Sequence, residues 1–150
     1  MRKIILVMGL MMFIVLANAQ INNPVTWNHT AVKIADKVYE LRLTASIDAN
    51  WHMYAQDAGE GLEPTIINFI PNPLISFNGK VKEVGKLQSS YEKYFKSVSK
   101  YYAKDIAFVQ KIKVKSQVGT VVKGTISYVV CNDRQCLPPK EVPFSIYVGG

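Results

Sequence analysis

The sequence is poor in cysteine, in long apolar runs and in familiar catalytic motifs. It has two cysteines in 150 residues, and its strongest apolar run covers the 13 residues 4–16. A membrane-spanning helix needs about 20 apolar residues, so we expect no segment to span a membrane. The sequence has no G-x-S-x-G elbow, no H-E-x-x-H pair and no Walker-type loop. The serine-hydrolase, zinc-protease and P-loop classes are therefore excluded in any recognisable form.

The N-terminus has the three parts of a secretory signal peptide. Arg2 and Lys3 precede the apolar run, and Ala17-Asn18-Ala19 follows it as a cleavage site. We therefore predict a signal peptide over residues 1–19 and cleavage after Ala19. The mature chain, residues 20–150, has no cysteine near its start that could be lipidated. We expect it to be periplasmic or secreted, with no membrane insertion after cleavage, in a compartment where a disulfide persists.

The mature chain has the size of one domain and a moderate positive charge. Removal of residues 1–19 leaves 131 residues, enough for a single core. Two of the 18 basic residues leave with the signal peptide, so 16 basic and 11 acidic residues give a net charge of +5. The lysines are spread along the chain rather than massed, which favours a solvated face over nucleic-acid binding. We expect a monomer that binds no nucleic acid.

Alternation of apolar and polar residues dominates the mature chain. Within residues 38–47, Tyr39, Leu41 and Leu43 alternate with Glu40 and Arg42. The same period of two recurs over residues 106–114, 122–130 and 142–148. This period is typical of strands with one buried face. We therefore predict an all-β fold, an immunoglobulin-like antiparallel β-sandwich.

Two segments between these strands carry different local signals. Asn78-Gly79 is a hairpin signal and predicts a turn between strands at 74–77 and 81–84. Over residues 89–102, aromatic and apolar residues recur at helical spacing, and Ser89 and Glu92 are placed as a capping box. We predict one short helical or cap-loop segment near 89–102, whose aromatic side chains either pack on the sandwich or cover a reactive site.

The two cysteines, Cys131 and Cys136, follow the predicted strand 122–130 and precede Pro138 and Pro139. Prolines donate no backbone hydrogen bond, so strand pairing stops there and the cysteines fall at the rim of a sheet. A disulfide that closes so short a loop stabilises a domain by only about 2 kcal/mol. From the spacing alone, a redox-active pair and an inert disulfide in a non-catalytic binding or structural domain both remain open.

A zinc site is the other chemistry that these residue types allow. His29 and His52 would complete a tetrahedral set with the two cysteines. Their spacing is unlike that of a zinc finger, and we expect no metal. We interpret His52 as one member of an aromatic strand edge. The alternative interpretation places it near the cysteines, where it would influence a thiolate.

The segment YVVCNDRQCLPP, residues 128–139, resembles the cysteine motif of the N-terminal periplasmic domain of the bacterial DsbD thiol-disulfide interchange proteins, with Leu137, Pro138 and Pro139 as supporting residues. The segment WHMYAQ, which includes Trp51, His52 and Tyr54, is similar to the aromatic stretch after the family's early strand. Tyr94-Phe95 falls where the family carries a cap loop. The resemblance covers residues 27–148.

The resemblance implies an electron-relay module, a thiol-disulfide oxidoreductase that needs no bound cofactor. It implies that the domain takes electrons from a thioredoxin-like donor and passes them to oxidised client proteins through mixed disulfides. Cys136 would bond to partners and Cys131 would resolve that bond. Phe95 with Tyr94 would form the cap, and Tyr54 would line the pocket beneath it. The family's membrane conduit and thioredoxin-like domain are not in this sequence, so we expect the donor to be another protein.

Overall fold

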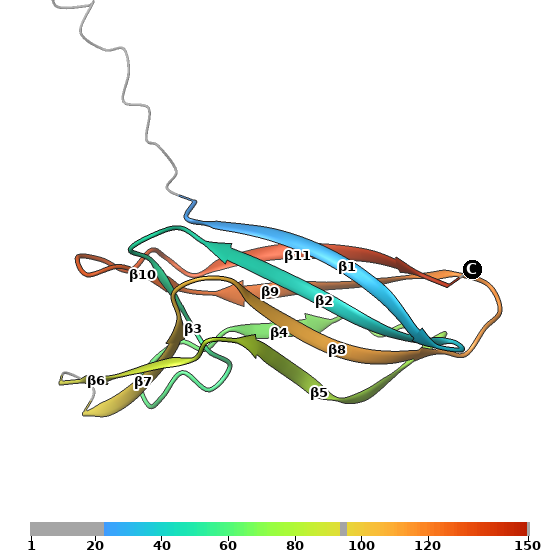
Figure 1. Cartoon of the computed structure of the whole chain (residues 1–150), viewed down its shortest axis with the longest axis horizontal. Coiled ribbons are helices and arrows are strands. Elements are labelled where there is room, and N and C mark those ends of the chain that lie inside the picture. The colour runs from blue at the N-terminus through green and yellow to red at the C-terminus, as the bar shows by residue number, and fades with distance from the viewer. Residues whose placement is uncertain (1–22, 94–95, 150) are drawn as a thin grey trace, which may run out of the picture.

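The protein is built from β-strands (Figure 1). The computed structural model describes residues 23–93 and 96–149. Every secondary-structure element within those ranges is a β-strand. Neither range contains a helix that is long and apolar enough to cross a membrane. The predicted signal peptide, Tyr94 and Phe95 lie outside the described residues. The prediction of an all-β, immunoglobulin-like antiparallel sandwich is confirmed.

Three antiparallel sheets make up the domain. The first has the order β1 (Val25–Ala35), β2 (Val38–Ile47), β8 (Ile106–Val114), β5 (Ile75–Gly85). The second has the order β11 (Lys140–Val148), β9 (Thr120–Tyr128), β4 (Ile66–Phe69). The third has the order β10 (Val130–Cys131), β3 (His52–Tyr54), β7 (Ser97–Tyr102), β6 (Gln88–Glu92). The first two form the elongated body of Figure 1, and the third lies at the end opposite the C-terminus.

The core lies between the first and second sheets, where the alternating apolar side chains meet. Leu43 of β2 and Phe108 of β8 are directly opposite each other in the ladder, and both are buried. Ile126 and Phe144 face them from β9 and β11. Burying each of these side chains contributes about 1.5–3 kcal/mol. Trp27 of β1 closes one side of the core by stacking on Phe108 and Tyr128, with ring centroids 6.1 and 5.4 Å apart.

The predicted hairpin at Asn78-Gly79 is wrong, because residues 75–85 form one strand. Both of its halves pair with β8: Phe77 lies opposite Ile112, and Lys82 lies opposite Val109. The register shifts between Asn78 and Lys82, and Gly79 adopts a φ of 75° there. The long central strand β8 provides backbone partners for both halves. The Asn-Gly pair therefore forms a bulge instead of a chain reversal.

On both sides of residues 94–95 the segment near 89–102 is extended, as the antiparallel pair β6 and β7, so the helical form of that prediction is also wrong. Tyr91 of β6 pairs with Val98 of β7, and both side chains are largely exposed. On its other side, β7 pairs with β3 through Tyr101 and Tyr102. A helix would have left the edge of β3 without hydrogen-bond partners, and β-branched and aromatic residues suit a strand. Tertiary pairing therefore overrides the helical spacing.

Candidate functional site: a disulfide at the end of the sandwich

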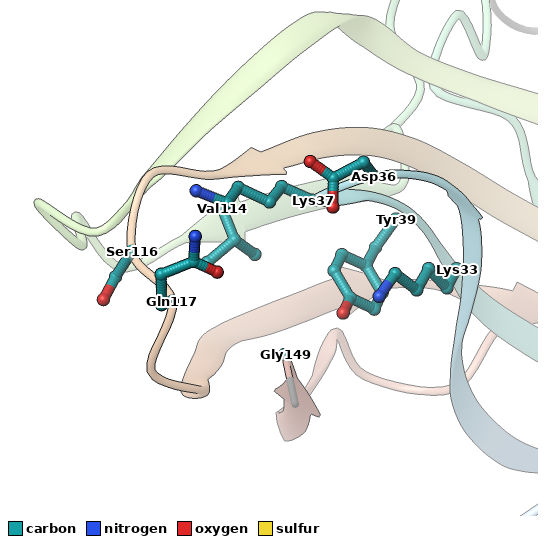
Figure 2. Close-up of a pocket in the computed structure, with 8 residues that line it drawn as sticks. All are labelled: Lys33, Asp36, Lys37, Tyr39, Val114, Ser116, Gln117 and Gly149. Carbon is teal, nitrogen blue, oxygen red and sulfur yellow. The ribbon is translucent and has the colours of Figure 1, made fainter.

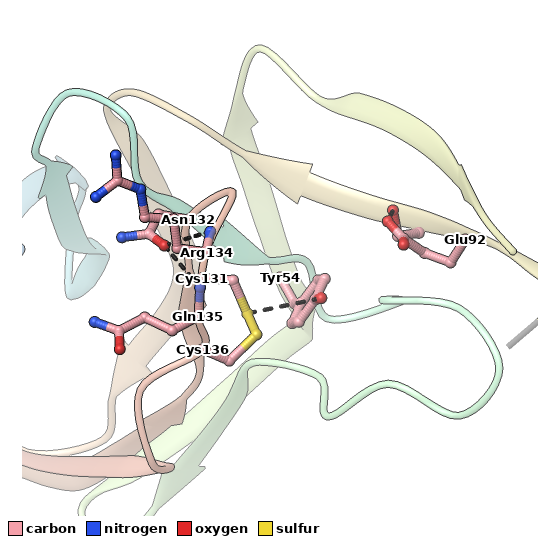
Figure 3. Close-up of a disulfide and its surroundings, with 8 residues drawn as sticks. Tyr54, Glu92, Cys131, Asn132, Arg134, Gln135 and Cys136 are labelled. Atoms are coloured by element: carbon pink, nitrogen blue, oxygen red, sulfur yellow. Dashed lines mark hydrogen bonds between the residues drawn. A yellow bond between two sulfur atoms is a disulfide. The ribbon is translucent and has the colours of Figure 1, made fainter. Parts of the chain in front are cut away.

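Cys131 and Cys136 form a disulfide at the end of the molecule that carries the third sheet (Figures 1 and 3). Their sulfur atoms are 2.01 Å apart and their Cα atoms 3.9 Å apart, and the two residues form an isolated antiparallel bridge. The N–H of Leu137 donates to the carbonyl of Val130 at 2.9 Å. The cysteines therefore form the base of a narrow loop, and β10, which ends at Cys131, is an edge strand of the third sheet, in line with the predicted position at a sheet rim.

Asn132 shapes the loop between the cysteines. Its Oδ1 accepts hydrogen bonds from the N–H groups of Arg134 and Gln135, both at 2.9 Å, and its own N–H donates to the carbonyl of Gln135 at 2.8 Å. An Asn side chain that bonds the backbone two and three residues ahead holds a turn without help from other elements. The loop conformation is therefore defined locally, and the disulfide is one of several bonds that hold it.

The two sulfurs have different surroundings. Cys131, at the end of β10, is 2% exposed and packs in a small apolar cluster with Tyr54, Ala58, Val129 and, at its border, Leu62. Cys136 follows the loop and is exposed. Disulfide exchange requires a thiolate to approach one sulfur in line with the S–S bond. In this arrangement the incoming thiolate has access at Cys136, and the leaving sulfur belongs to Cys131.

Tyr54 supplies the only side-chain hydrogen bond to the disulfide within the described ranges. Its hydroxyl donates to Sγ of Cys131 across 3.8 Å (Figure 3). Tyr54 is 9% exposed, and burial raises the pKa of its phenol, with the negative charge of Glu92 adding to the increase. The phenol thus keeps its proton at neutral pH and remains a donor. The structure places this predicted pocket residue against the buried sulfur.

His52 lies directly opposite Cys131 in the β3–β10 ladder. Its ring is 4.7 Å from that of Tyr101 and 5.8 Å from that of Tyr54. Burial lowers the pKa of His52, and the charges of Asp133 and Glu92 partly oppose that shift. The imidazole is therefore predominantly neutral at pH 7, on the residue that pairs with Cys131.

Trp51 supports the disulfide loop from beside it. It is 9% exposed and belongs to the main core. It also lines a cavity of about 380 Å³ together with Asn50, Asn132, Asp133 and Arg134. Leu137 is half-buried against the same core, whereas Pro138 and Pro139 are exposed and end the ladder before β11 begins. The structure thus brings Trp51, His52, Tyr54 and the cysteine motif together.

Sequence reasoning missed the role of Glu92, which it treated as a helix-capping residue. Glu92 ends β6, and its Oε1 accepts a hydrogen bond from Ser99 Oγ at 3.0 Å. It lies near enough to raise the pKa of both Tyr54 and His52. No periodicity in the sequence predicts that Glu92 lies near Tyr54 and His52, because this proximity depends on how β6 and β7 pair with β3. Tyr94 and Phe95, between these two strands in sequence, are outside the described residues, so their predicted capping role stays a prediction.

No metal site accompanies the disulfide in the part of the chain that the structure describes, because no three His, Cys, Asp or Glu side chains gather there. His29, the other histidine, lies in β1 and stacks near Phe144, with ring centroids 5.8 Å apart. A cavity of about 100 Å³ lies near the C-terminus and is lined by residues that include Lys33, Tyr39 and Gly149 (Figure 2). None of the cysteine-site residues lines this cavity.

The fold and the site define a class of protein: an immunoglobulin-like sandwich with a disulfide at one end, one sulfur buried and one exposed. The sequence matches the family described as thiol:disulfide interchange protein DsbD, N-terminal, over residues 22–146. The chain therefore belongs to the DsbD N-terminal domain family, as the cysteine motif predicted. No curated protein matches the sequence.

Solved structures show the same fold at low sequence identity. The reduced DsbD N-terminal domain of Neisseria meningitidis is 18% identical with a TM-score of 0.55, covering 87% of this chain and 93% of that one. The N-terminal periplasmic domain of ScsB from Proteus mirabilis is 18% identical with a TM-score of 0.57, covering 89% of this chain and 49% of that one. A complex of the DsbD and PilB N-terminal domains from Neisseria meningitidis matches at 15% identity and a TM-score of 0.50, covering 89% of this chain and 87% of that one.

Proposed function

We propose that the domain relays two electrons by thiol-disulfide exchange at Cys131 and Cys136, between a thioredoxin-like donor and oxidised client proteins. The observation that carries the proposal is the difference in exposure between the two sulfurs, since Cys136 is exposed and Cys131 is 2% exposed. A purely structural disulfide does not require one exposed and one buried sulfur. Membership of a disulfide interchange family also supports the proposal.

The first half of the cycle reduces the domain. A donor thiolate attacks Sγ of Cys136, a donor–Cys136 disulfide forms, and the Cys131–Cys136 bond breaks with its electron pair leaving on Cys131. The hydroxyl of Tyr54 already points at that sulfur and stabilises the developing thiolate, because hydrogen bonds to a charged acceptor are stronger than to a neutral one. The donor's second thiolate then attacks the donor sulfur of the mixed disulfide. This step forms a disulfide within the donor, which dissociates, and releases Cys136 as a thiolate.

The second half of the cycle reduces a client. The Cys136 thiolate attacks a client disulfide, and one client sulfur departs as a thiolate. Cys131 then attacks Sγ of Cys136, which re-forms the domain's disulfide and releases the second client thiolate. In the complete cycle, two electrons and the accompanying protons pass from the donor to the client, and no other atoms are transferred. The buried position of Cys131 suits the resolving role, because only Cys136 needs to be within its reach.

We propose that partners bind as thioredoxin-like domains and that the domain itself is a monomer. The solved complex of a DsbD N-terminal domain with the PilB N-terminal domain supports the pairing of this fold with a second domain. We also propose that the protein acts in the periplasm after cleavage following Ala19. The described periplasmic location of the ScsB domain supports that placement. Mass spectrometry of the exported protein, with Gln20 expected as its first residue, tests the cleavage site.

The reduction potential of the purified mature protein is the deciding measurement for the proposed exchange. The protein is equilibrated in dithiol redox buffers, and thiol labelling and circular dichroism are read on the same samples. We expect a reversible couple well above about −300 mV with the fold retained in both states, because structural disulfides usually lie below that value. A disulfide that opens only when the domain unfolds would leave a non-catalytic binding or structural domain.

A further inference from the structure

The outer face of the first sheet carries a concentration of positive charge that the exchange reaction does not use. Side chains of a strand alternate between its two faces, and in β2 and β8 the core residues take one face. The opposite positions hold Arg42 in β2 and Lys111 and Lys113 in β8. Lys82 of β5 lies opposite Val109 and so joins the same face.

Two further lysines extend this surface. Lys80 lies in the bulge of β5, and Lys115, just after β8, continues the exposed alternation of Lys111 and Lys113. Its N–H donates to the carbonyl of Leu74, the residue before β5. We call these six residues the basic face: Arg42, Lys80, Lys82, Lys111, Lys113 and Lys115. Glu40, paired with Arg42 at 2.8 Å, is the one carboxylate at the outward positions of β1, β2, β5 and β8, all of which the structure describes.

This face accounts for the net charge of the whole domain. After residue 19 the chain has 16 basic and 11 acidic residues. The basic face has six of the basic residues, and Glu40 beside it is one of the acidic residues, which leaves ten of each sign for the rest of the molecule. The rest of the molecule is neutral in sum, so an anionic surface gains most from contact with the basic face.

The chemistry of the face suits a charged surface better than a single acidic group. Five of its six cations are lysines, which are mobile point charges, whereas a carboxylate site is usually built on the fork of an arginine. The one arginine already pairs with Glu40. Between β2 and β5, a groove of about 420 Å³ has Val84 and Val109 among its lining residues, with Lys82 and Lys111 beside them. Val32 and Val84, about half exposed, add apolar contacts among the cations.

We propose that the basic face docks the domain on an anionic phospholipid bilayer. Each lysine near such a surface strengthens binding by roughly fivefold at moderate ionic strength. Cys131 ends β10, a strand of the third sheet, and Figure 1 shows β10 at the end of the molecule, away from the middle of the first sheet. A domain that lies on its first sheet thus keeps Cys136 open to a partner. The docking is independent of the proposed exchange chemistry.

The test is co-sedimentation of the mature protein with vesicles, in both redox states. One set contains phosphatidylcholine and phosphatidylglycerol in equal amounts, and the other phosphatidylcholine alone. The test variant neutralises three lysines of the basic face: Lys82→Gln, Lys111→Gln and Lys113→Gln. The matched control removes the same charge elsewhere, from exposed residues: Lys104→Gln, Lys123→Gln and Lys140→Gln. Thermal unfolding confirms that both variants fold.

We expect the wild type to bind only the anionic vesicles and to be released at about 1 M salt, where the Debye length is about 3 Å. The basic-face variant should bind about 100-fold more weakly, and the control within about threefold of wild type. Equal loss in the two variants would overturn the proposal, because net charge alone would then explain binding. Absence of wild-type binding to anionic vesicles would also overturn the proposal. If the wild type were then retained on a polyglutamate resin, the basic face would be assigned to binding an acidic protein.

Discussion

The hydroxyl of Tyr54 donates a hydrogen bond to Sγ of Cys131, a residue 77 positions away in the sequence. The bond is formed because β3 lies between β10 and β7, so the tyrosine side chain reaches the sulfur from the neighbouring strand. Both partners are at least nine-tenths buried. The bond therefore acts on the sulfur that leaves when a thiolate attacks Cys136, and it makes the role of the tyrosine testable.

Replacing Tyr54 with Phe should slow reduction of the disulfide by about tenfold, because a hydrogen bond to a charged group contributes about 1.5–3 kcal/mol. Stopped-flow reduction by dithiothreitol at neutral pH measures the rate. Tyr101→Phe is the matched control, since Tyr101 stacks on His52 and has no hydrogen bond to either sulfur among the described contacts. Equal slowing in the two variants would show that the hydroxyl of Tyr54 has no special role.

The two cysteines should differ in reactivity when each is left alone. In Cys131→Ser, the remaining Cys136 is exposed and should react with iodoacetamide at least about tenfold faster than Cys131 does in Cys136→Ser. Only Cys131→Ser should accumulate a mixed disulfide with a thioredoxin-like partner. Mass spectrometry of alkylated samples over time gives both rates. Similar rates would contradict the assignment of attack to Cys136.

Gly59, in the loop 55–65, should tolerate substitution less well than Gly79. It has a φ of 110°, and a Cβ there would collide with the carbonyl oxygen of Val98. Gly59→Ala should cost about 1–3 kcal/mol in the free energy of unfolding. It should also speed reduction of the disulfide, because neighbouring Ala58 packs against Cys131.

Gly79→Ala is the comparison for this glycine. Gly79 has a φ of 75°, but no atom lies within 4 Å of the added Cβ, so only the backbone preference is lost, about 1 kcal/mol. Urea unfolding followed by fluorescence measures both variants. A larger loss at Gly79 than at Gly59 would contradict the collision with Val98.

Stability should fall below neutral pH partly because of His29. Its Nε2 is buried with no hydrogen-bond partner among the residues that the structure describes, and burial lowers the pKa of the imidazole. The unfolded chain then binds a proton near pH 6.5 while the folded chain does not. Stability is therefore fully present above about pH 6.5 and decreases as the pH falls from there toward the lowered folded pKa.

His29→Phe should reduce the loss of stability between about pH 7.5 and pH 5, as measured by urea midpoints. His52→Phe should reduce it less, because Asp133 and Glu92 oppose the effect of burial on the pKa of His52. An unchanged pH dependence in His29→Phe would show that its imidazole does not contribute.

Local pattern predicted the fold where one strand face is buried. The ranges expected at 38–47 and 106–114 coincide with β2 and β8, because their alternation is continuous and they lie at the centre of the first sheet. Pattern failed at Asn78-Gly79 and over 89–102. In both places the backbone found partners in a distant strand, β8 or β3, and those hydrogen bonds outweighed a local turn or helix preference.

The sequence by itself indicated a β-sandwich and placed the cysteines at the rim of a sheet, because strand alternation and proline chemistry are local properties, and its cysteine motif carried the resemblance to the DsbD N-terminal domains. The tertiary structure decided which sulfur is buried, that Tyr54 and His52 reach Cys131, and that Glu92 lies close to both aromatic side chains. It also gathered six cations on one face. These relationships depend on the pairing of strands that are far apart in sequence, which no local pattern specifies.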